Sequence, residues 1–133
     1  MSGRTAFFTD ELFLEHDTGA GHPESHHRLV AIHDRLSKQS YFSELQQLKP
    51  RPATIAEIGL IHDTNYAEKL KAFCEQNGGY LDPDTPVSAR SFEAAALSAG
   101  AGIEAVDQIL AGHIDRAALL LRPPGHHSLK HKA

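Results

Sequence analysis

Apolar residues along the chain form short continuous runs, typical of strands, and helical patterns with spacings of three and four. The runs at residues 4–8 and 117–121 predict two strands. A third short strand is expected at 45–48, because the prolines of 49–52 cannot continue a central strand. The 117–121 run lacks the period of two of a half-exposed strand. We therefore expect it to be covered on both faces, as in a parallel sheet with helices on each side.

The first helix is expected at residues 24–39, where apolar residues recur at intervals of three and four. Its apolar face consists of Leu29, Ile32 and Leu36. Pro23 is expected to open this helix at its first position, where the missing N–H does no harm. The preceding residues 16–24 contain two glycines and form a loop. The polar groups of this loop either bond within it or line a site, and the composition favours the first alternative.

Two shorter helices are predicted in the middle of the chain. Thr54 and Glu57 fit a capping box at the start of a helix of two turns. Asp63 or Thr64 can cap the next helix, which the glycines of 78–79 end. The apolar face of this next helix consists of Tyr66, Leu70 and Phe73.

The longest helix is predicted at residues 91–111, where Ser91 can cap it and Gly112 ends it. One of its surfaces consists of small residues, namely Ala94, Ala95, Ala96, Ser98, Ala99, Gly100, Ala101 and Gly102. Each glycine inside a helix costs roughly 1 kcal/mol relative to alanine. We therefore expect this surface to pack closely on a neighbouring sheet or helix, which offsets that cost.

The order of strand, helices and strand predicts one α/β domain that spans residues 1–133. In sheets of this kind, ligands bind beyond the carboxyl ends of the strands. His126 and His127 follow the predicted 117–121 strand closely, so they are placed at that edge of the sheet.

Composition excludes several classes of function. A net charge of −4 argues against a nucleic-acid binder that neutralises phosphates. The single cysteine, Cys74, rules out an intrachain disulfide and a cysteine-based zinc site, and we expect it to be a small buried apolar side chain. The sequence shows neither a signal peptide nor a membrane span, so no membrane partner is expected and the expected location is cytoplasmic.

Residues 122–127 read Arg-Pro-Pro-Gly-His-His and join a stiff turn to two imidazoles. A neutral imidazole can take a proton from water, and its conjugate acid can return one to a leaving amine. His126, His127 and His131 could instead be three metal ligands, or the pair could lie incidentally on a surface loop. The stiff turn favours a functional role, because it holds both histidines in place.

Residues 80–88 form a predicted loop in which Asp82 and Asp84 are separated by a proline. Two carboxylates at this spacing could bind a cation or a cationic substrate. Such residues beside prolines more commonly form an Asx-type turn, and we favour that interpretation.

The residues at 122–127 resemble a signature of the zinc-dependent histone deacetylase superfamily, in its class II and acetylpolyamine amidohydrolase branch. The resemblance extends in order over nearly the whole chain. Residues 16–24 followed by Arg28 resemble the N-terminal loop and first helix of the family, and His62 with Tyr66 matches its histidine and tyrosine on the next helix. Residues 81–85 resemble the family's rim loop, and an alanine-rich helix follows them as in the family.

The resemblance implies the N-terminal portion of an arginase/deacetylase α/β fold, a three-layer parallel-sheet fragment. It assigns His126 and His127 as the proton-handling pair, with His127 as general base and then acid, and His126 as its electrostatic partner. Arg28 matches an arginine that lines an internal cavity, and Asp82 lies in a loop that holds the substrate backbone in some members. Asp82, Arg28 and Gly125 are therefore the candidate substrate-binding residues.

The family's zinc ligands lie well beyond the tandem histidines, as does its transition-state tyrosine. We therefore expect no metal ligand and no cofactor in this chain alone, although the full-length family uses zinc. In zinc hydrolases the metal activates water and polarises the carbonyl, so we expect a truncated deacetylase without activity of its own.

Two alternatives stay open, and one expectation concerns assembly. The chain could be a metal-dependent amide hydrolase completed by another chain, or a module that binds a small ligand or a protein. An apolar strand without its neighbours exposes an edge that pairs with other chains. We therefore expect a homodimer or a higher homo-oligomer.

Overall fold

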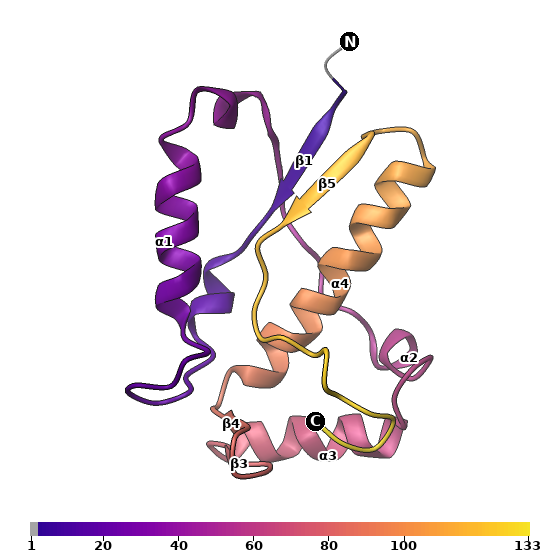
Figure 1. The fold of residues 1–133 in the computed structure, drawn as a ribbon. Coiled ribbons are helices and arrows are strands. Elements are labelled where there is room, and N and C mark those ends of the chain that lie inside the picture. The colour runs from indigo at the N-terminus through magenta and orange to yellow at the C-terminus, as the bar shows by residue number, and fades with distance from the viewer. Residues whose placement is uncertain (1–2) are drawn as a thin grey trace.

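Three parallel strands in the order β2–β1–β5 form the centre of the fold in the computed structural model, which describes residues 3–133 (Figure 1). The strands are β1 (Thr5–Phe8), β2 (Gln46–Leu48) and β5 (Arg116–Leu119). Phe8 at the end of β1 is paired with Leu48 on one side and Leu119 on the other. The predicted α/β class with a parallel sheet is therefore confirmed.

Helices cover both faces of this sheet. They are the 3-10 helix η1 (Glu11–Leu14), α1 (His26–Ser37), the 3-10 helix η2 (Ser40–Glu44), α2 (Ile55–Ile58), α3 (Thr64–Glu75) and α4 (Ser91–Leu110). Figure 1 shows α1 on one side of β1 and β5 and α4 on the other. The expected three layers are therefore present.

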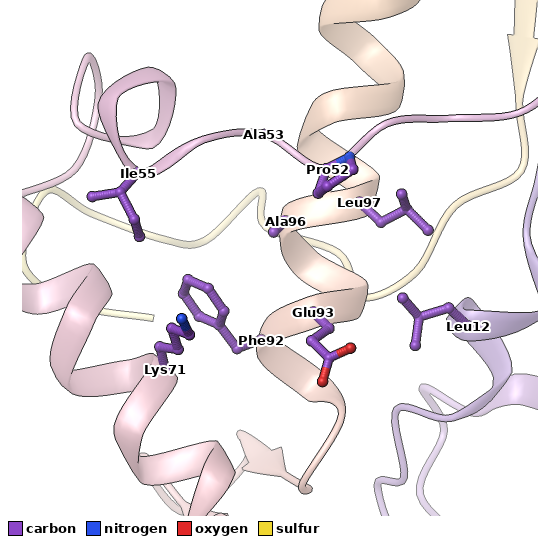
Figure 2. Close-up of a pocket in the computed structure, with 9 residues that line it drawn as sticks. All are labelled: Leu12, Pro52, Ala53, Ile55, Lys71, Phe92, Glu93, Ala96 and Leu97. Carbon is purple, nitrogen blue, oxygen red and sulfur yellow. The ribbon is translucent and has the colours of Figure 1, made fainter.

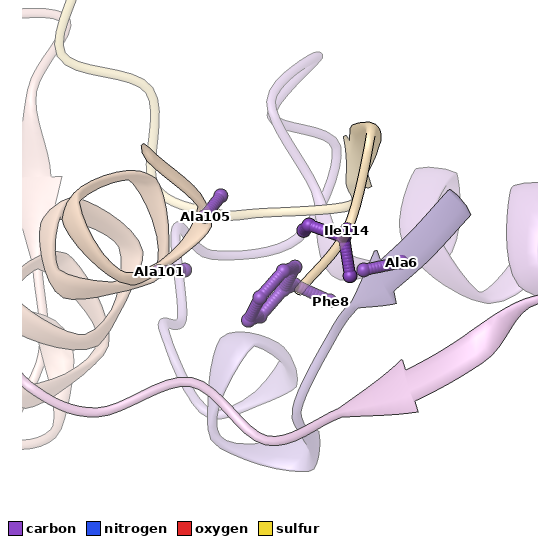
Figure 3. Packing of buried hydrophobic residues seen from close by; sticks show 5 residues of the cluster. All are labelled: Ala6, Phe8, Ala101, Ala105 and Ile114. Atoms are coloured by element: carbon purple, nitrogen blue, oxygen red, sulfur yellow. The ribbon is translucent and has the colours of Figure 1, made fainter. Parts of the chain in front are cut away.

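Side chains of β1 alternate between the two helical layers. Phe7 faces α1 and η2, where its ring centroid lies 6.3 Å from that of His33 and 5.6 Å from that of Phe42. Ala6 and Phe8 face the opposite way and pack on α4, as Figure 3 shows for Ala6, Phe8, Ala101, Ala105 and Ile114. This alternation is what a strand buried on both faces requires.

The small residues of α4 permit close approach, as the sequence predicts. A Cβ atom at Gly100 would collide with the backbone oxygen of Arg51. The N–H of Ala53 also donates to the Ala96 carbonyl at 2.8 Å. The neighbour at this point is the extended segment 51–53, and α4 packs on the sheet through Ala101 and Ala105.

Local signals for helix ends give mixed outcomes. The capping box of Thr54 and Glu57 is formed, and the Asp63 carboxylate caps α3 by accepting from the Tyr66 N–H at 3.1 Å. The predicted position of Pro23 is wrong, because α1 begins at His26 with Ser25 as its N-cap. The Ser25 side chain makes no cap hydrogen bond, so the proline lies in the loop ahead of the helix.

Two predicted helix faces are also wrong in part. In α1 Leu29 is buried, whereas Ile32 is 45% exposed, because α1 forms an outer layer on a small sheet. In α3 the buried residues are Ala67 and Cys74, and the predicted face is at most half-buried. The prediction that Cys74 is a buried apolar side chain is confirmed, and burial raises the pKa of its thiol.

The predicted strand at 117–121 forms but is not covered on both faces. β5 lies at an edge of the sheet, pairs with β1 and leaves Leu119 39% exposed. Within residues 3–133 no strand lies on its outer side. An apolar strand of the type found in sheet interiors therefore presents an open edge here.

The predicted loop at 80–88 also differs from the structure. It contains a small antiparallel hairpin of β3 (Gly79–Tyr80) and β4 (Pro86–Val87). No helix among the described residues is long and apolar enough to cross a membrane.

Candidate functional site

Arg122 anchors the start of the tandem-histidine segment. Its side chain is fully buried, and its Nε and Nη2 atoms donate to the two carboxylate oxygens of Glu24 at 2.8 and 2.9 Å. Its Nη1 atom donates to the backbone oxygens of Phe13 and His16 at 3.0 and 2.6 Å. A buried charge that is paired in this bidentate way holds its backbone in one place.

His16 extends this network toward α4. Its Nδ1 atom lies 2.6 Å from the Ser91 hydroxyl, and its Nε2 atom lies 3.6 Å from a carboxylate oxygen of Glu24. Burial, followed by the neighbouring Arg122 guanidinium, lowers the pKa of His16 to about 4. The imidazole is therefore neutral at neutral pH, and its contact with Glu24 is not a charge pair.

Ser91 serves this network and not the predicted cap of α4. The N-cap residue of α4 is Arg90, and its side chain makes no cap bond. The Ser91 hydroxyl accepts from the Ser88 N–H at 2.7 Å and contacts His16 on its other side. The prediction of a Ser91 cap is wrong because Ser91 is the first residue of the helix, one position after the N-cap residue Arg90.

The loop at residues 16–24 forms hydrogen bonds within itself, as the favoured alternative predicts. Thr18 donates to the Glu24 carbonyl at 2.6 Å, and the Gly19 N–H donates to the Asp17 carboxylate at 2.8 Å. Gly19 and Gly21 adopt positive φ angles of 83° and 79°, which suit glycine. The loop also lines a cavity of about 260 Å³ that reaches to the first turn of α1.

His126 and His127 occupy the two central positions of a tight turn. The Gly125 carbonyl accepts from the backbone N–H of Ser128 at 3.0 Å and from its hydroxyl at 2.6 Å. The two imidazole centroids lie 4.3 Å apart with the ring planes tilted by 55°, and both side chains are exposed. The adjacent rings can therefore exchange protons with solvent or with a bound molecule.

Two of the three candidate substrate residues, Arg28 and Asp82, lie on other elements than the tandem histidines. Arg28 is half-exposed and contacts Glu24 at 3.4 Å. It lines neither the cavity beside the loop at 16–24 nor a second, larger cavity. Gly125 closes the histidine turn, and Asp82 lies in the β3–β4 hairpin. No hydrogen bond among the described residues joins Arg28 or Asp82 to the tandem histidines. Arg28 instead shares Glu24 with the buried Arg122.

The Asp82 carboxylate forms the favoured Asx-type turn. It accepts from the Asp84 N–H at 2.9 Å, and this bond lowers the pKa of Asp82. The Asp84 carboxylate lies 3.5 Å from His22 Nε2, so the tip of the hairpin faces the loop at 16–24. The turn that the sequence favours is confirmed, and it leaves Asp84 almost wholly exposed.

The larger cavity, of about 390 Å³, has none of the predicted site residues in its lining, which Figure 2 shows. It lies between η1, the segment 52–55, α3 and α4. Apolar side chains such as Leu12, Phe92 and Leu97 form most of its wall, and Lys71 and Glu93 also line it. The tandem histidines are exposed, and neither this cavity nor the one beside the loop at 16–24 includes them in its lining.

The zinc that the resemblance implies does not fit residues 3–133. Their histidine, cysteine and acidic side chains form no group of three placed to hold a metal ion. His126, His127 and His131 are thus not assembled as three ligands.

Sequence reasoning missed Arg122 as a buried arginine and singled out Arg28 only as a match to an arginine that lines an internal cavity. The available signal was an arginine that ends an apolar run and precedes two prolines. An arginine that continues a buried strand is itself expected to be buried, and a buried charge needs a carboxylate partner. Nothing in the local sequence indicates that the partner is Glu24, 98 residues earlier.

Comparisons with known proteins agree with the resemblance. The model of the histone deacetylase domain matches residues 22–133. The histone deacetylase-like amidohydrolase of Pseudomonas aeruginosa is 37% identical over 150 residues, covering 100% of this chain and 40% of that protein. The polyamine deacetylase HDAC10 of Homo sapiens is 35% identical over 112 residues, covering 75% of this chain and 16% of that protein.

Among solved structures, the HDA15 HD domain superimposes with a TM-score of 0.91 at 29% sequence identity. The superposition covers 98% of this chain and 38% of that one. The chain therefore spans about 40% of the length of the Pseudomonas aeruginosa relative and of this solved domain.

Proposed function

The chain belongs to the histone deacetylase family, and from this premise we propose that it supplies the proton-handling half of a deacetylase site. By itself this stretch of 133 residues would not hydrolyse an acetyl amide. The observation that supports the proposal is the turn in which His126 and His127 lie side by side, exposed and fixed beyond β5 by Arg122.

The proposed chemistry is general acid and base catalysis. Neutral His127 takes a proton from the attacking water and returns one to the leaving amine, while His126 acts as its electrostatic partner. Proton transfer of this kind contributes about 10²–10⁴-fold to a rate. That contribution is too small for useful amide hydrolysis unless water and carbonyl are also activated.

A metal ion would supply this second contribution in a zinc hydrolase. Because the described residues form no three-ligand group, we propose that the ligands come from sequence outside these 133 residues. They would lie in a longer polypeptide or in a second chain. The greater length of the relatives supports this proposal.

We propose acetylated amines as the class of substrate, on the strength of the two named relatives. Arg28, Asp82 and Gly125 remain the candidate substrate-binding residues. For Gly125, the proposal is supported by its position in the turn that carries both histidines.

We also propose that the isolated chain self-associates through the outer edge of β5. The exposed Leu119 and the absence of a described strand on that side support this proposal. The occupant of the edge would be a second copy of the chain, unless longer sequence covers it first.

The decisive experiment uses the chain alone and in combination. Purified chain is assayed for zinc and for turnover of an acetyl-lysine reporter, and then mixed with the part of the Pseudomonas aeruginosa relative that it does not cover. We expect activity in the mixture, loss of that activity in His127→Ala, and none with either part alone. Turnover by the isolated chain, or full activity of His127→Ala in the mixture, would refute the proposal.

A further inference from the structure

The segment that follows the tandem histidines is fastened to the junction of α2 and α3. The Asp63 N–H donates to the Lys130 carbonyl at 2.9 Å, and His62 Nδ1 lies 2.9 Å from the Leu129 carbonyl. A carbonyl oxygen only accepts, so Nδ1 of His62 carries the hydrogen. Leu129 and Lys132 also form a small bridge that folds the end of the segment back on itself.

Both donors are themselves fixed by α3. The Asp63 carboxylate caps this helix by accepting from the Tyr66 N–H, which leaves the Asp63 N–H free to reach Lys130. The His62 ring lies beside Tyr66 with their centroids 6.0 Å apart. The two donors therefore form a rigid anchor at the start of a twelve-residue helix.

The tandem histidines lie between two anchors of different kinds. Upstream, the buried Arg122 is bound to Glu24. Downstream, Ser128 alone separates His127 from Leu129, which His62 holds. Figure 1 shows this last segment leaving β5, passing α4 and ending beside α2 and α3. Within residues 3–133, no other hydrogen bond ties 123–133 to the rest of the chain.

We infer that His62 is a positioning residue for His126 and His127, acting through Leu129 together with the Asp63 N–H. Without the His62 donor, only the bond from the Asp63 N–H to the Lys130 carbonyl holds this end, so the turn loosens and the two imidazoles sample more orientations. The expected effect on the catalytic rate rests on the proposed function, whereas the expected loss of order of the two imidazoles does not. In the assembled hydrolase a disordered base slows the chemical step and leaves substrate binding nearly unchanged.

The test compares His62→Ala with His62→Asn, whose amide nitrogen can take the place of Nδ1 as a donor. His113→Ala is the matched control, because His113 is exposed and contacts Gln108 at the far end of α4. Imidazole NMR signals of His126 and His127 report their order, and hydrogen exchange at the Asp63 amide reports the anchor.

In His62→Ala we expect averaged imidazole signals and exchange at Asp63 faster by about tenfold, the effect of one lost hydrogen bond of ordinary strength. His62→Asn should restore both readouts, and His113→Ala should change neither. Unchanged signals and unchanged exchange in a folded His62→Ala chain would overturn the inference. If that variant does not fold, His62→Phe keeps the ring beside Tyr66 without the donor and answers the same question.

A second readout separates this inference from the proposed function. In the mixture with the remainder of the relative, His62→Ala should lower kcat by about tenfold with KM within about twofold. An unchanged kcat in an active mixture would count against positioning. If the wild-type mixture is inactive while the NMR and exchange effects appear, the proposed function fails and the positioning of the turn stands.

Discussion

Arg122 and the histidine turn that follows it belong to one hexapeptide but have opposite surroundings. Arg122 is fully buried and binds three residues that lie about a hundred positions earlier in the chain. His126 and His127 are exposed, and the turn that carries them closes on the neighbouring Ser128. The difference shows how a reactive pair can stay accessible while its backbone is held by a charge buried a few residues away.

The largest effect on stability is expected when the buried side chain of Arg122 is removed. Arg122→Met removes the donors of two backbone oxygens and leaves the Glu24 carboxylate with only the half-exposed Arg28 at 3.4 Å. We expect a loss of about 3–5 kcal/mol in the free energy of unfolding, measured by urea denaturation. Arg28→Met, which removes a half-exposed partner of the same carboxylate, should cost at most about 1 kcal/mol. A loss below about 1 kcal/mol in Arg122→Met would show that the buried ion pair of Arg122 and Glu24 is not the anchor.

Acid should weaken the anchor through His16. Its pKa in the folded chain is about 4, below the ordinary value of 6.5, so the folded state disfavours protonation. This contribution to stability is complete above pH 6.5 and declines as the pH falls toward 4, by about 3 kcal/mol in total. The difference in urea stability between pH 7 and pH 4 should therefore be larger in the wild type than in His16→Gln. Equal pH dependence in the two proteins would contradict the assignment.

The open edge of β5 is a second exposed feature of this region, and a charge placed on it tests the proposed assembly. Ala118→Lys places a charge on this exposed strand, and a lysine there discourages pairing with another chain. We expect the wild type to associate at micromolar concentration, and the variant to dissociate with a constant at least about tenfold higher, a change of about 1.4 kcal/mol. Sedimentation velocity measures this dissociation constant. A wild type that sediments as a folded monomer would refute the proposed assembly.

The smallest effect on stability is expected at the histidine turn. His126→Ala and His127→Ala remove exposed rings that make no hydrogen bond to the rest of the described chain. Each should change the free energy of unfolding by less than about 0.5 kcal/mol in urea denaturation. A loss above about 1 kcal/mol would mean that these rings contribute to the fold as Arg122 does.

Local features were predictable where the determining residues are neighbours in the chain. The capping box at Thr54, the cap at Asp63 and the end of α4 at Gly112 depend on contacts within a few residues. The Asx-type turn at Asp82 belongs to the same class. Ser91 fails as a cap because it is the first residue of α4, and its hydroxyl contacts His16, 75 residues away.

The sequence by itself determined the strands β1, β2 and β5, the four α-helices, the family and the place of the tandem histidines after β5, but not η1, η2 or the β3–β4 hairpin. Its periodicities and short motifs report local hydrogen bonding and the side of an element that turns inward. Only the tertiary structure decided which arginine is buried, which carboxylate pairs with it and which strand is left at the edge. These outcomes depend on distant partners, since Arg122 and Glu24 are 98 residues apart and burial exists only once the layers pack. The histidine pair could therefore be found in the sequence, but the two anchors that hold it could not.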